Sequence, residues 1–357
     1  MVATDEQTRR ERFGRRLMDA TNGAFDVATA YLGIRLGLYR SLADNGPATA
    51  AELAARTGTN ERLVREWLEQ QAASEILQST RQTDGWRFRL PADHAAVLLD
   101  PDALDGFGGT ILAQIASLAA VPRLVEAFRT GMGIPFADYG ADMIEGQAAS
   151  TRPVYRTELP TWLAAIPDPG GRLSGGSARI LDIGCGLGWS SIGIARSLTG
   201  AHVDGVDLDR ASIEVARSLA TERGFGDRVT FEVRDATSLA GAGYDLATMF
   251  EMLHDLAHPV EVLRAARQAL APGGLVLVAD EITGDEFNGP ADETDRRHYG
   301  WSVIHCLPAS MTEPDSAGTG TVMRSSTVRA YAEAAGFSSI EILPVDSVAF
   351  RLYLLRP

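Results

Sequence analysis

Residues 182–188 read Asp-Ile-Gly-Cys-Gly-Leu-Gly, between the apolar run ARILDIG that begins at residue 178 and the helical pattern SSIGIARSL that begins at residue 190. A strand, a glycine-rich turn and a helix in this order are typical of an α/β domain whose ligand lies against the helix N-terminus. The glycines follow the spacing GxGxG with an acid two positions before the first, whereas the dinucleotide fingerprint is GxGxxG. A carboxylate beside this turn disfavours a pyrophosphate and favours a cationic group.

Apolar strand patterns alternate with helical patterns from residue 178 onward. This alternation predicts a parallel, doubly wound sheet that binds its ligand outside the C-terminal ends of the strands. The last two strand patterns follow each other closely enough to pair antiparallel. The predicted strands are ARILDIG, AHVDGVDLD, RVTFEVRDA, YDLATMFEML, GLVLVADEIT, SSIEILPVD and SVAFRLYLLR.

Acidic residues lie at or near the ends of the first three of these strands, at Asp182, Asp207 and Asp235. A carboxylate at the end of the second strand can accept hydrogen bonds from both hydroxyls of a ribose. One at the end of the third strand can accept a hydrogen bond from an adenine amino group. The three acids predict a pocket for a ligand with a ribose, an adenine and a positive charge but no phosphate, and S-adenosylmethionine has these parts.

On these motifs, residues 178–357 resemble a class I S-adenosylmethionine-dependent methyltransferase. DIGCGLG, GVDLD, RDA and LAPGGLVLVADE follow one another at that family's usual spacing, and the antiparallel tail is also typical of it. The resemblance implies a Rossmann-like, seven-stranded α/β domain, with S-adenosylmethionine as cofactor and S-adenosylhomocysteine as product. It implies cofactor contacts at Asp182, Gly184, Gly186, Gly188, Asp207, Leu208, Asp235 and Ala236, and pocket lining by Phe250 and Glu251.

The first hundred residues carry the pattern of an α-rich winged helix. Thr49 can cap the helical pattern AAELAARTG, and Thr59 or Asn60 can cap NERLVREWLEQQAASEIL. The stretch LQSTRQTDGWRFRL then reads as two strands around Asp84-Gly85. This module also resembles the dimerisation domain of two-domain small-molecule methyltransferases, which implies a homodimer.

A winged helix also suggests DNA binding, but the second helical pattern carries Glu61, Glu66 and Glu69 beside its arginines. That face is not basic, so packing and dimerisation explain the module better. The whole chain has 33 Lys and Arg against 47 Asp and Glu, a net charge of −14 that disfavours nucleic acid and anionic membranes as partners.

Between the two modules the sequence predicts a helical linker. It contains a loop at residues 133–147, GIPFADYGADMIEGQ, that we expect to face the substrate. The chain is similar to a group of actinobacterial methyltransferases of largely unassigned substrate that share GIPFADYG and YGWSVIHCLP. That similarity implies substrate contacts at Tyr139 and Trp301, and we add His305 as a third. We therefore expect a dimerisation domain at 1–100, the linker and loop at 101–175, and the methyltransferase domain at 176–357.

A general base is needed if the methyl group is transferred to a hydroxyl. His254 and Asp255 follow the fourth strand, where plant-type O-methyltransferases carry a His-Asp pair whose histidine is the base. In that resemblance an acid at the end of the fifth strand holds the ring, and Asp280 occupies this position. We expect methyl transfer to a small molecule, most simply at a hydroxyl, with secondary metabolism as the setting.

Three other functions stay open. His254, Asp255 and His305 could form a two-histidine, one-carboxylate metal site, as in keto-acid C-methyltransferases that this arrangement resembles. A winged-helix regulator that binds the cofactor is a second alternative, and an NAD-linked oxidoreductase a third.

Compartment and membrane contact can also be read from the sequence. The two cysteines, Cys185 and Cys306, and the charged N-terminus favour a reducing, cytoplasmic location. The uncharged run at residues 106–122 is too short and too interrupted for a membrane span, so we expect a buried helix there.

Overall fold

The computed structural model describes residues 2–83, 85–168, 171–239, 241 and 243–357. The chain divides into two compact units between Ile115 and Ala116. Most of the segment expected as a linker therefore belongs to the second unit, since residues 116–175 fold with the sheet that follows them.

The first unit is a helical domain with one β-hairpin, as a winged helix requires. Asn60 rather than Thr59 caps the helix Glu61–Ala73. Thr49 caps the helix Ala50–Thr57 and forms a capping box with Glu52. Asp84, at the expected turn, lies outside the described residues. The elements are α1 (Val2–Arg35), α2 (Leu38–Asn45), α3 (Ala50–Thr57), α4 (Glu61–Ala73), β1 (Gln78–Gln82), β2 (Gly85–Arg89) and α5 (Ala92–Leu99).

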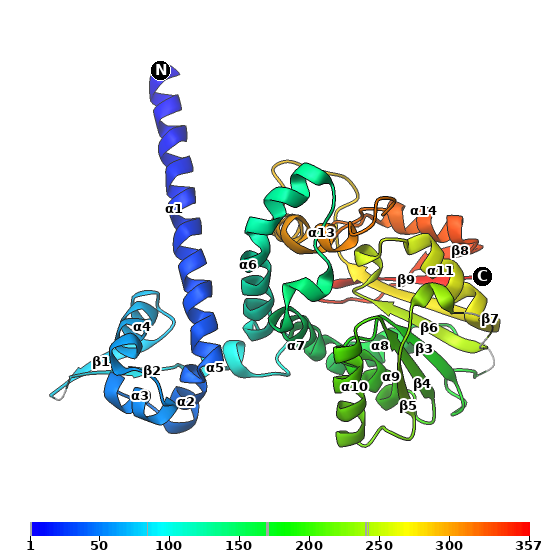
Figure 1. Ribbon diagram of the computed structural model, residues 1–357, viewed down its shortest axis with the longest axis horizontal. Helices are drawn as coiled ribbons and strands as arrows, with labels where there is room; N and C mark the ends of the chain where they lie inside the picture. The colour runs from blue at the N-terminus through cyan, green and yellow to red at the C-terminus, as the bar shows by residue number, and fades with distance from the viewer. Residues whose placement is uncertain (1, 84, 169–170, 240, 242) are drawn as a thin grey trace. The chain divides into compact units, whose positions relative to one another are not determined.

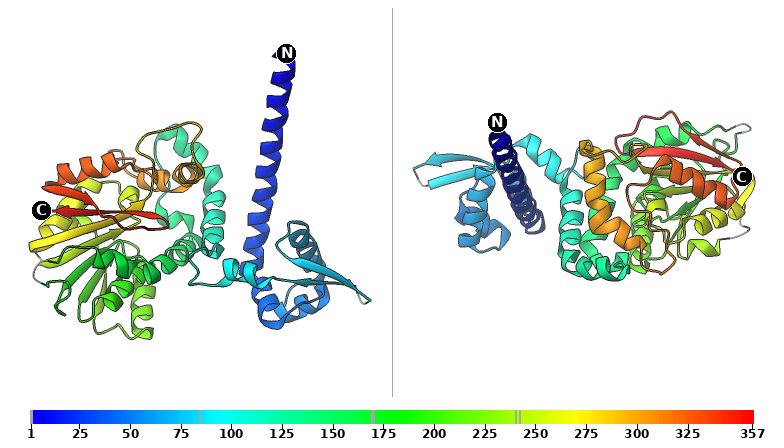
Figure 2. Two further views of the ribbon diagram at one scale, coloured as in Figure 1. Left: turned by 180° about the vertical axis from the view of Figure 1, so that it is seen from behind. Right: turned by 90° about the horizontal axis from the view of Figure 1, so that it is seen from above.

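Helix α1 is longer than the sequence pattern predicts, because the charged N-terminal residues continue the helix. Its N-terminal half extends beyond the other elements of its unit (Figures 1 and 2). Every described side chain from Asp5 to Phe25 is exposed. The core of this unit gathers instead around α2, α3, α4 and the hairpin, with Leu53, Leu68 and Phe88 buried.

The second unit contains the seven-stranded sheet that the sequence predicts. Its strand order is β5-β4-β3-β6-β7-β9-β8, and β9 alone runs antiparallel to its neighbours. The order reverses between β3 and β6, which makes this the point where an open α/β sheet binds its ligand. The strands are β3 (Arg179–Ile183), β4 (His202–Asp207), β5 (Val229–Val233), β6 (Tyr244–Phe250), β7 (Leu270–Glu281), β8 (Ser339–Ile342) and β9 (Phe350–Arg356).

Helices cover both faces of this sheet (Figure 1). One apolar core joins the sheet to α8, α9 and α10, and a second joins it to α11 and α14. The two cores account for the almost continuous burial of β3 and β6, as in a parallel sheet covered on both sides. The helices are α8 (Leu159–Ala164), α9 (Trp189–Ser197), α10 (Arg210–Glu222), α11 (Pro259–Ala269) and α14 (Ser325–Ala335).

The uncharged run expected as a buried helix forms α6 (Gly108–Thr130), which is only partly buried. By length and composition it could cross a membrane, and 39% of its most apolar stretch is buried. The expected buried helix is therefore buried on one side only. Leu118, Val121, Val125 and Phe128 remain exposed.

Two further segments connect the sheet to the ligand site. After α6 come a short 3-10 helix, η1 (Phe136–Tyr139), and α7 (Ala141–Thr157), which contacts α8 and α9. After β7, α12 (Glu293–Trp301) continues through a π-helical turn, η4 (Ser302–Cys306), into α13 (Leu307–Ser310). Single π-helical turns are frequent at functional sites.

Candidate active site

The glycine-rich turn after β3 is shaped by three residues with positive φ: Gly184 (71°), Gly186 (49°) and Gly188 (84°). A methyl group on Gly188 would approach the Phe231 ring to 2.7 Å, so only glycine fits there. At Gly186 the space is open, with no heavy atom within 4 Å. The turn therefore packs on one side and leaves its backbone accessible on the other.

Asp182 supports the glycine-rich turn from its buried side. Its carboxylate is buried and accepts hydrogen bonds from Ser190 Oγ (2.6 Å), Ser191 Oγ (2.6 Å) and Thr248 Oγ1 (2.8 Å). Burial raises its pKa, and the three hydroxyls oppose that shift. Because these donors surround it, Asp182 fixes the start of α9 and lies behind the pocket.

Asp207 and Asp235 lie in the pocket wall, at the ends of β4 and β5. Asp207 accepts hydrogen bonds from the backbone N–H groups of Gly186 (2.9 Å) and Asp209 (2.9 Å), and burial raises its pKa. Asp235 Oδ1 accepts from the backbone N–H and the hydroxyl of Thr237, both at 2.8 Å. Each carboxylate keeps lone pairs for a ligand.

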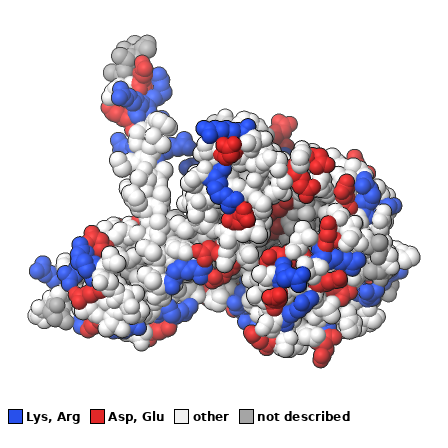
Figure 3. Space-filling model, viewed as in Figure 1, with Lys and Arg blue, Asp and Glu red and all other residues white. Residues whose placement is uncertain are grey.

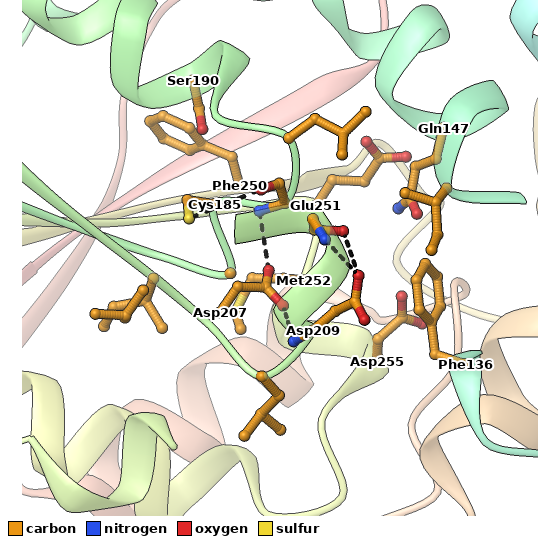
Figure 4. Close-up of a pocket in the computed structure, with 18 of the residues that line it drawn as sticks. Phe136, Gln147, Cys185, Ser190, Asp207, Asp209, Phe250, Glu251, Met252 and Asp255 are labelled. Atoms are coloured by element: carbon orange, nitrogen blue, oxygen red, sulfur yellow. Dashed lines mark hydrogen bonds between the residues drawn. The ribbon is translucent and has the colours of Figure 1, made fainter. Parts of the chain in front are cut away.

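A cavity of about 540 Å³ opens above these carboxylates at the C-terminal edge of the sheet (Figure 4). Of the residues predicted from sequence, Gly184, Gly186, Asp207, Leu208, Asp235, Ala236, Phe250, Glu251 and Asp255 line it. The remaining ones, Asp182, Gly188, His254, Asp280, Tyr139, Trp301 and His305, do not.

His254 lies just behind the wall, on the turn η3 (Leu253–Asp255) that follows β6. It is 2% exposed, and its Nδ1 lies 2.7 Å from Asp280 Oδ1. Its Nε2 lies 3.3 Å from Asp255 Oδ1. Burial opposes charging of the imidazole, but Asp280 and Asp255 together hold its pKa well above the ordinary value of 6.5. The imidazole is therefore held between two carboxylates.

The structure places Cys306, to which the sequence assigns no role, beside this pair. His254, Asp255 and Cys306 offer ligand atoms that all lie within 4.8 Å of one another. His305 is not in this group among the described residues, so the predicted two-histidine metal set is not assembled. The π-helical turn η4 causes the difference: it presents Cys306 to His254, while the His305 ring packs against Tyr139 at 4.6 Å.

The predicted substrate contacts form a packed support instead of pocket lining. Tyr139 is 5% exposed, and its hydroxyl donates to the backbone oxygen of Ile304 at 3.2 Å. His305 is also buried, and within the described part of the chain its Nε2 forms no hydrogen bond. Burial lowers its pKa. The loop expected at residues 133–147 does reach the cavity, through Pro135, Phe136, Ala137, Ile144 and Gln147. Ala309, directly after YGWSVIHCLP, also lines it.

The same backbone segment, residues 308–320, braces both the substrate-side loop and the histidine turn. A glycine is required in the loop, since a methyl group on Gly133 would lie 1.8 Å from Pro308 O. The backbone hydrogen bonds are Gly133 N to Met311 O (2.7 Å), Ile134 N to Pro308 O (3.1 Å), Ala317 N to Ala257 O (2.8 Å) and Gly320 N to His254 O (3.1 Å).

Sequence reasoning missed Trp189 and Met252, and in the loop at 133–147 it did not single out Phe136 or Gln147 as the residues that line the cavity. Trp189 and Met252 adjoin motif residues, so their position next to the glycine turn and to Glu251 was an available signal. Gln147 carries no such signal, because the start and the rotation of α7 decide which of its side chains face the cavity.

Two known domain families match the chain. Residues 175–316 match the family described as "Methyltransferase domain", and residues 26–99 match "Rv2258c-like winged HTH domain". The chain thus carries a methyltransferase domain preceded by a winged-helix domain.

Solved structures with the same fold cover almost the whole chain. The mitomycin 7-O-methyltransferase MmcR is 23% identical with a TM-score of 0.77, and covers 98% of this chain and 100% of its own. Human N-acetylserotonin methyltransferase, in complex with SAM, is 16% identical with a TM-score of 0.70 and 96% coverage of both chains. The fold is that of two-domain S-adenosylmethionine-dependent O-methyltransferases.

Among curated relatives, the ubiquinone biosynthesis O-methyltransferase of Aeromonas salmonicida (strain A449) is 39% identical over 125 residues. The match covers 34% of this chain and 49% of that protein, so the chain spans about half the length of this curated relative.

Proposed function

We propose that this protein transfers a methyl group from S-adenosylmethionine to a small molecule, at a hydroxyl. The observation that carries the proposal is the cavity at the switch point of the sheet, where the carboxylates of Asp207 and Asp235 lie beside the glycine turn and its open position at Gly186. Acids at these positions suit a ribose and an adenine and disfavour a phosphate. When bound, the cofactor supplies an electrophilic methyl group.

The chain's own residues would hold the cofactor along this wall. Asp207 would accept from the ribose hydroxyls, and Asp235 from the adenine amino group, with Leu208 against the ring. Gly184 and Gly186 let the ligand lie close to the backbone. Asp182 acts indirectly, because it fixes the helix start through Ser190 and Ser191.

We assign His254 as the general base, positioned by Asp280. Since Nδ1 faces Asp280, Nε2 is the nitrogen left to accept the acceptor's proton. Asp255 lines the cavity in front of it, so an acceptor hydroxyl meets Asp255 before it reaches Nε2. The raised pKa makes the imidazole a stronger base than a free histidine. Catalysis requires its deprotonated form, so turnover should rise with pH through this raised pKa.

Metal-assisted C-methylation of a keto acid is the second candidate, and the cluster of His254, Asp255 and Cys306 favours it. A histidine that gives its other ring nitrogen to a carboxylate, as His254 does to Asp280, is typical of metal ligands. A thiolate, an imidazole and a carboxylate suit Zn²⁺. Metal analysis of protein purified without chelators decides between the candidates, because a stoichiometry near zero removes this one.

We propose a homodimer from the exposed apolar surface of α1, in the first unit. Along α1, uncharged surface follows a charged N-terminal end (Figure 3), and Phe13, Leu17, Met18 and Phe25 are exposed. Exposed apolar stripes of this length mark interaction sites, and we propose a second copy as the occupant. Light scattering after gel filtration tests it, with Leu17→Glu/Met18→Glu expected to give a monomer. We also propose a cytoplasmic location for the protein.

The function is tested by calorimetry with S-adenosylhomocysteine as ligand and NAD as control. Binding of S-adenosylhomocysteine alone supports the proposal and justifies a screen of phenols as acceptors. If NAD binds in its place, the oxidoreductase reading replaces ours. Binding of neither would leave the glycine turn without its assigned ligand and would contradict the proposal.

A further inference from the structure

The charged residues that line the cavity are almost all acidic. Among the described lining residues there are five carboxylates and a single cation, Arg234. Arg234 is at the end of β5, next to Asp235, and its guanidinium lies 3.7 Å from Glu232 and 3.3 Å from the backbone oxygen of Ser238. This positive charge therefore lies at the end of the cavity where the adenosine of the cofactor is proposed to bind.

The other half of the cavity carries Glu251 and Asp255. Figure 4 shows Phe136, Gln147 and Asp255 on the side of the cavity away from Asp207. Apolar residues from the loop before α7 and from α13 line the cavity as well, among them Pro135, Phe136, Ala137 and Ala309. Asp255 has the His254 imidazole 3.3 Å away to balance its charge. Of these two carboxyl groups, Asp255 is the one paired with His254, and Glu251 has no cation within ion-pair distance among the described residues.

The backbone at Glu251 adopts a conformation that only a few non-glycine residues adopt. Its φ is 53°, and its N–H donates to Ala279 O at 2.8 Å, which turns the chain sharply at the end of β6. Within the described part of the chain, its carboxylate forms no hydrogen bond or ion pair. A strained backbone that presents an unpaired carboxyl group to a cavity is typical of functional sites.

The surroundings of Glu251 disfavour its charged form. Burial and the nearby Glu281 raise its pKa well above the ordinary value, as do Asp255 and Asp280. His254 acts in the opposite direction but does not cancel the shift. Glu281 itself lies 3.4 Å from His298 Nε2 and does not line the cavity. A cation placed in this half would reverse the effect, because it would stabilise the ionised Glu251.

We propose that Glu251 recognises a protonated nitrogen on the methyl acceptor, so that the substrate is an apolar or aromatic molecule with an ammonium or amidinium group. This inference rests on the proposed function, and it names the substrate class of the same site. An anionic acceptor would instead face Glu251 and Asp255 together. A keto acid could then bind only with a metal ion to supply the missing positive charge.

The first test compares three phenols of similar size that differ in charge: tyramine, 4-propylphenol and 4-hydroxyphenylacetate. Their Kd values are measured by calorimetry on chelator-treated protein loaded with S-adenosylhomocysteine. We expect tyramine to bind about tenfold or more tightly than the other two. Glu251→Gln should bring the three within about threefold of one another, while the Kd of S-adenosylhomocysteine stays unchanged.

Proton release gives a second, independent readout. Tyramine binding near neutral pH should release up to one proton from Glu251, measured as the difference in heat between phosphate and Tris buffers. Glu251→Gln should release none. Glu281→Gln is the matched control: it removes a neighbouring buried carboxyl group outside the cavity, so the preference for tyramine should persist while fewer protons are released.

Three results would overturn the proposal. The first is no measurable preference for tyramine, including the case in which none of the three phenols binds. The second is a preference that survives in Glu251→Gln. The third is a loss of S-adenosylhomocysteine affinity in that variant with the preference intact, which would assign Glu251 to the cofactor. If wild-type protein does not bind S-adenosylhomocysteine, the proposed function fails separately, and the phenols are compared on the unloaded protein.

Discussion

His254 Nδ1 lies 2.7 Å from Asp280 Oδ1, and both side chains are only 2% exposed. This buried pair joins the turn after β6 to the end of β7, two neighbouring strands of the sheet. Because one ring nitrogen is committed to Asp280, the orientation of the imidazole and the nitrogen that can accept a proton are both fixed.

Replacing His254 should abolish proton removal without affecting the cofactor. We expect His254→Ala to lower methyl transfer to a phenolic acceptor by about 100-fold or more, the scale of general base catalysis. S-adenosylhomocysteine affinity, measured by calorimetry, should stay unchanged because His254 does not line the cavity. Unchanged turnover would show that proximity alone drives the transfer.

The pKa of His254 can be measured directly by ¹⁵N NMR of histidine-labelled protein. We expect it above 6.5, because Asp280 and Asp255 stabilise the imidazolium more than burial disfavours it. Turnover should accordingly rise with pH through that raised value. Asp280→Asn should move the titration and the rate limb to lower pH, and a titration that does not move would contradict the assigned pairing.

Two glycines of one turn should respond differently to the same substitution. Gly188→Ala brings a methyl group to 2.7 Å from Phe231, so we expect a loss of about 2 kcal/mol or more in the free energy of unfolding. Gly186→Ala meets open space but places the methyl group at the cavity, so it should weaken S-adenosylhomocysteine binding with a smaller loss of stability. Urea denaturation and calorimetry on both variants measure the two effects, and equal behaviour would argue against a one-sided turn.

We expect replacement of Asp182 to affect the stability of the fold, because its side chain does not contact the ligand directly. Asp182→Ala would leave the buried hydroxyls of Ser190, Ser191 and Thr248 without their acceptor, at a cost of about 3 kcal/mol in the free energy of unfolding. Urea denaturation measures it, with the exposed Asp227→Ala as control. A variant as stable as the wild type would mean that the hydroxyls find other partners.

The parts of the site that follow from strand ends could be predicted, because parallel strands bring their C-terminal residues to one edge. Asp207, Asp235 and Glu251 reach the cavity for this reason. Whether a side chain points into the cavity or behind it depends on local rotation that spacing does not fix. Asp182 lies two residues before the turn and points back toward α9.

The structure places Cys306, and not the predicted His305, beside His254, and the reason is similar. A π-helical turn changes which side of the helix each residue occupies, and nothing in the letters SVIHC marks it. In the first unit, the winged-helix pattern was recognisable because caps and a hairpin are local features. The full length of α1 was not, because charged residues at an N-terminus carry no apolar periodicity.

The bracing of two functional parts by residues 308–320 bears on how this enzyme scaffold can diversify. An insertion or deletion in the loop around Gly133 would strain the backbone bonds to Pro308 and Met311, and through the same segment the turn that carries His254. Loop length is therefore a poor route to new acceptors. Evolution and protein engineering should instead alter specificity by exchanging single side chains of the wall, such as Phe136, at constant chain length.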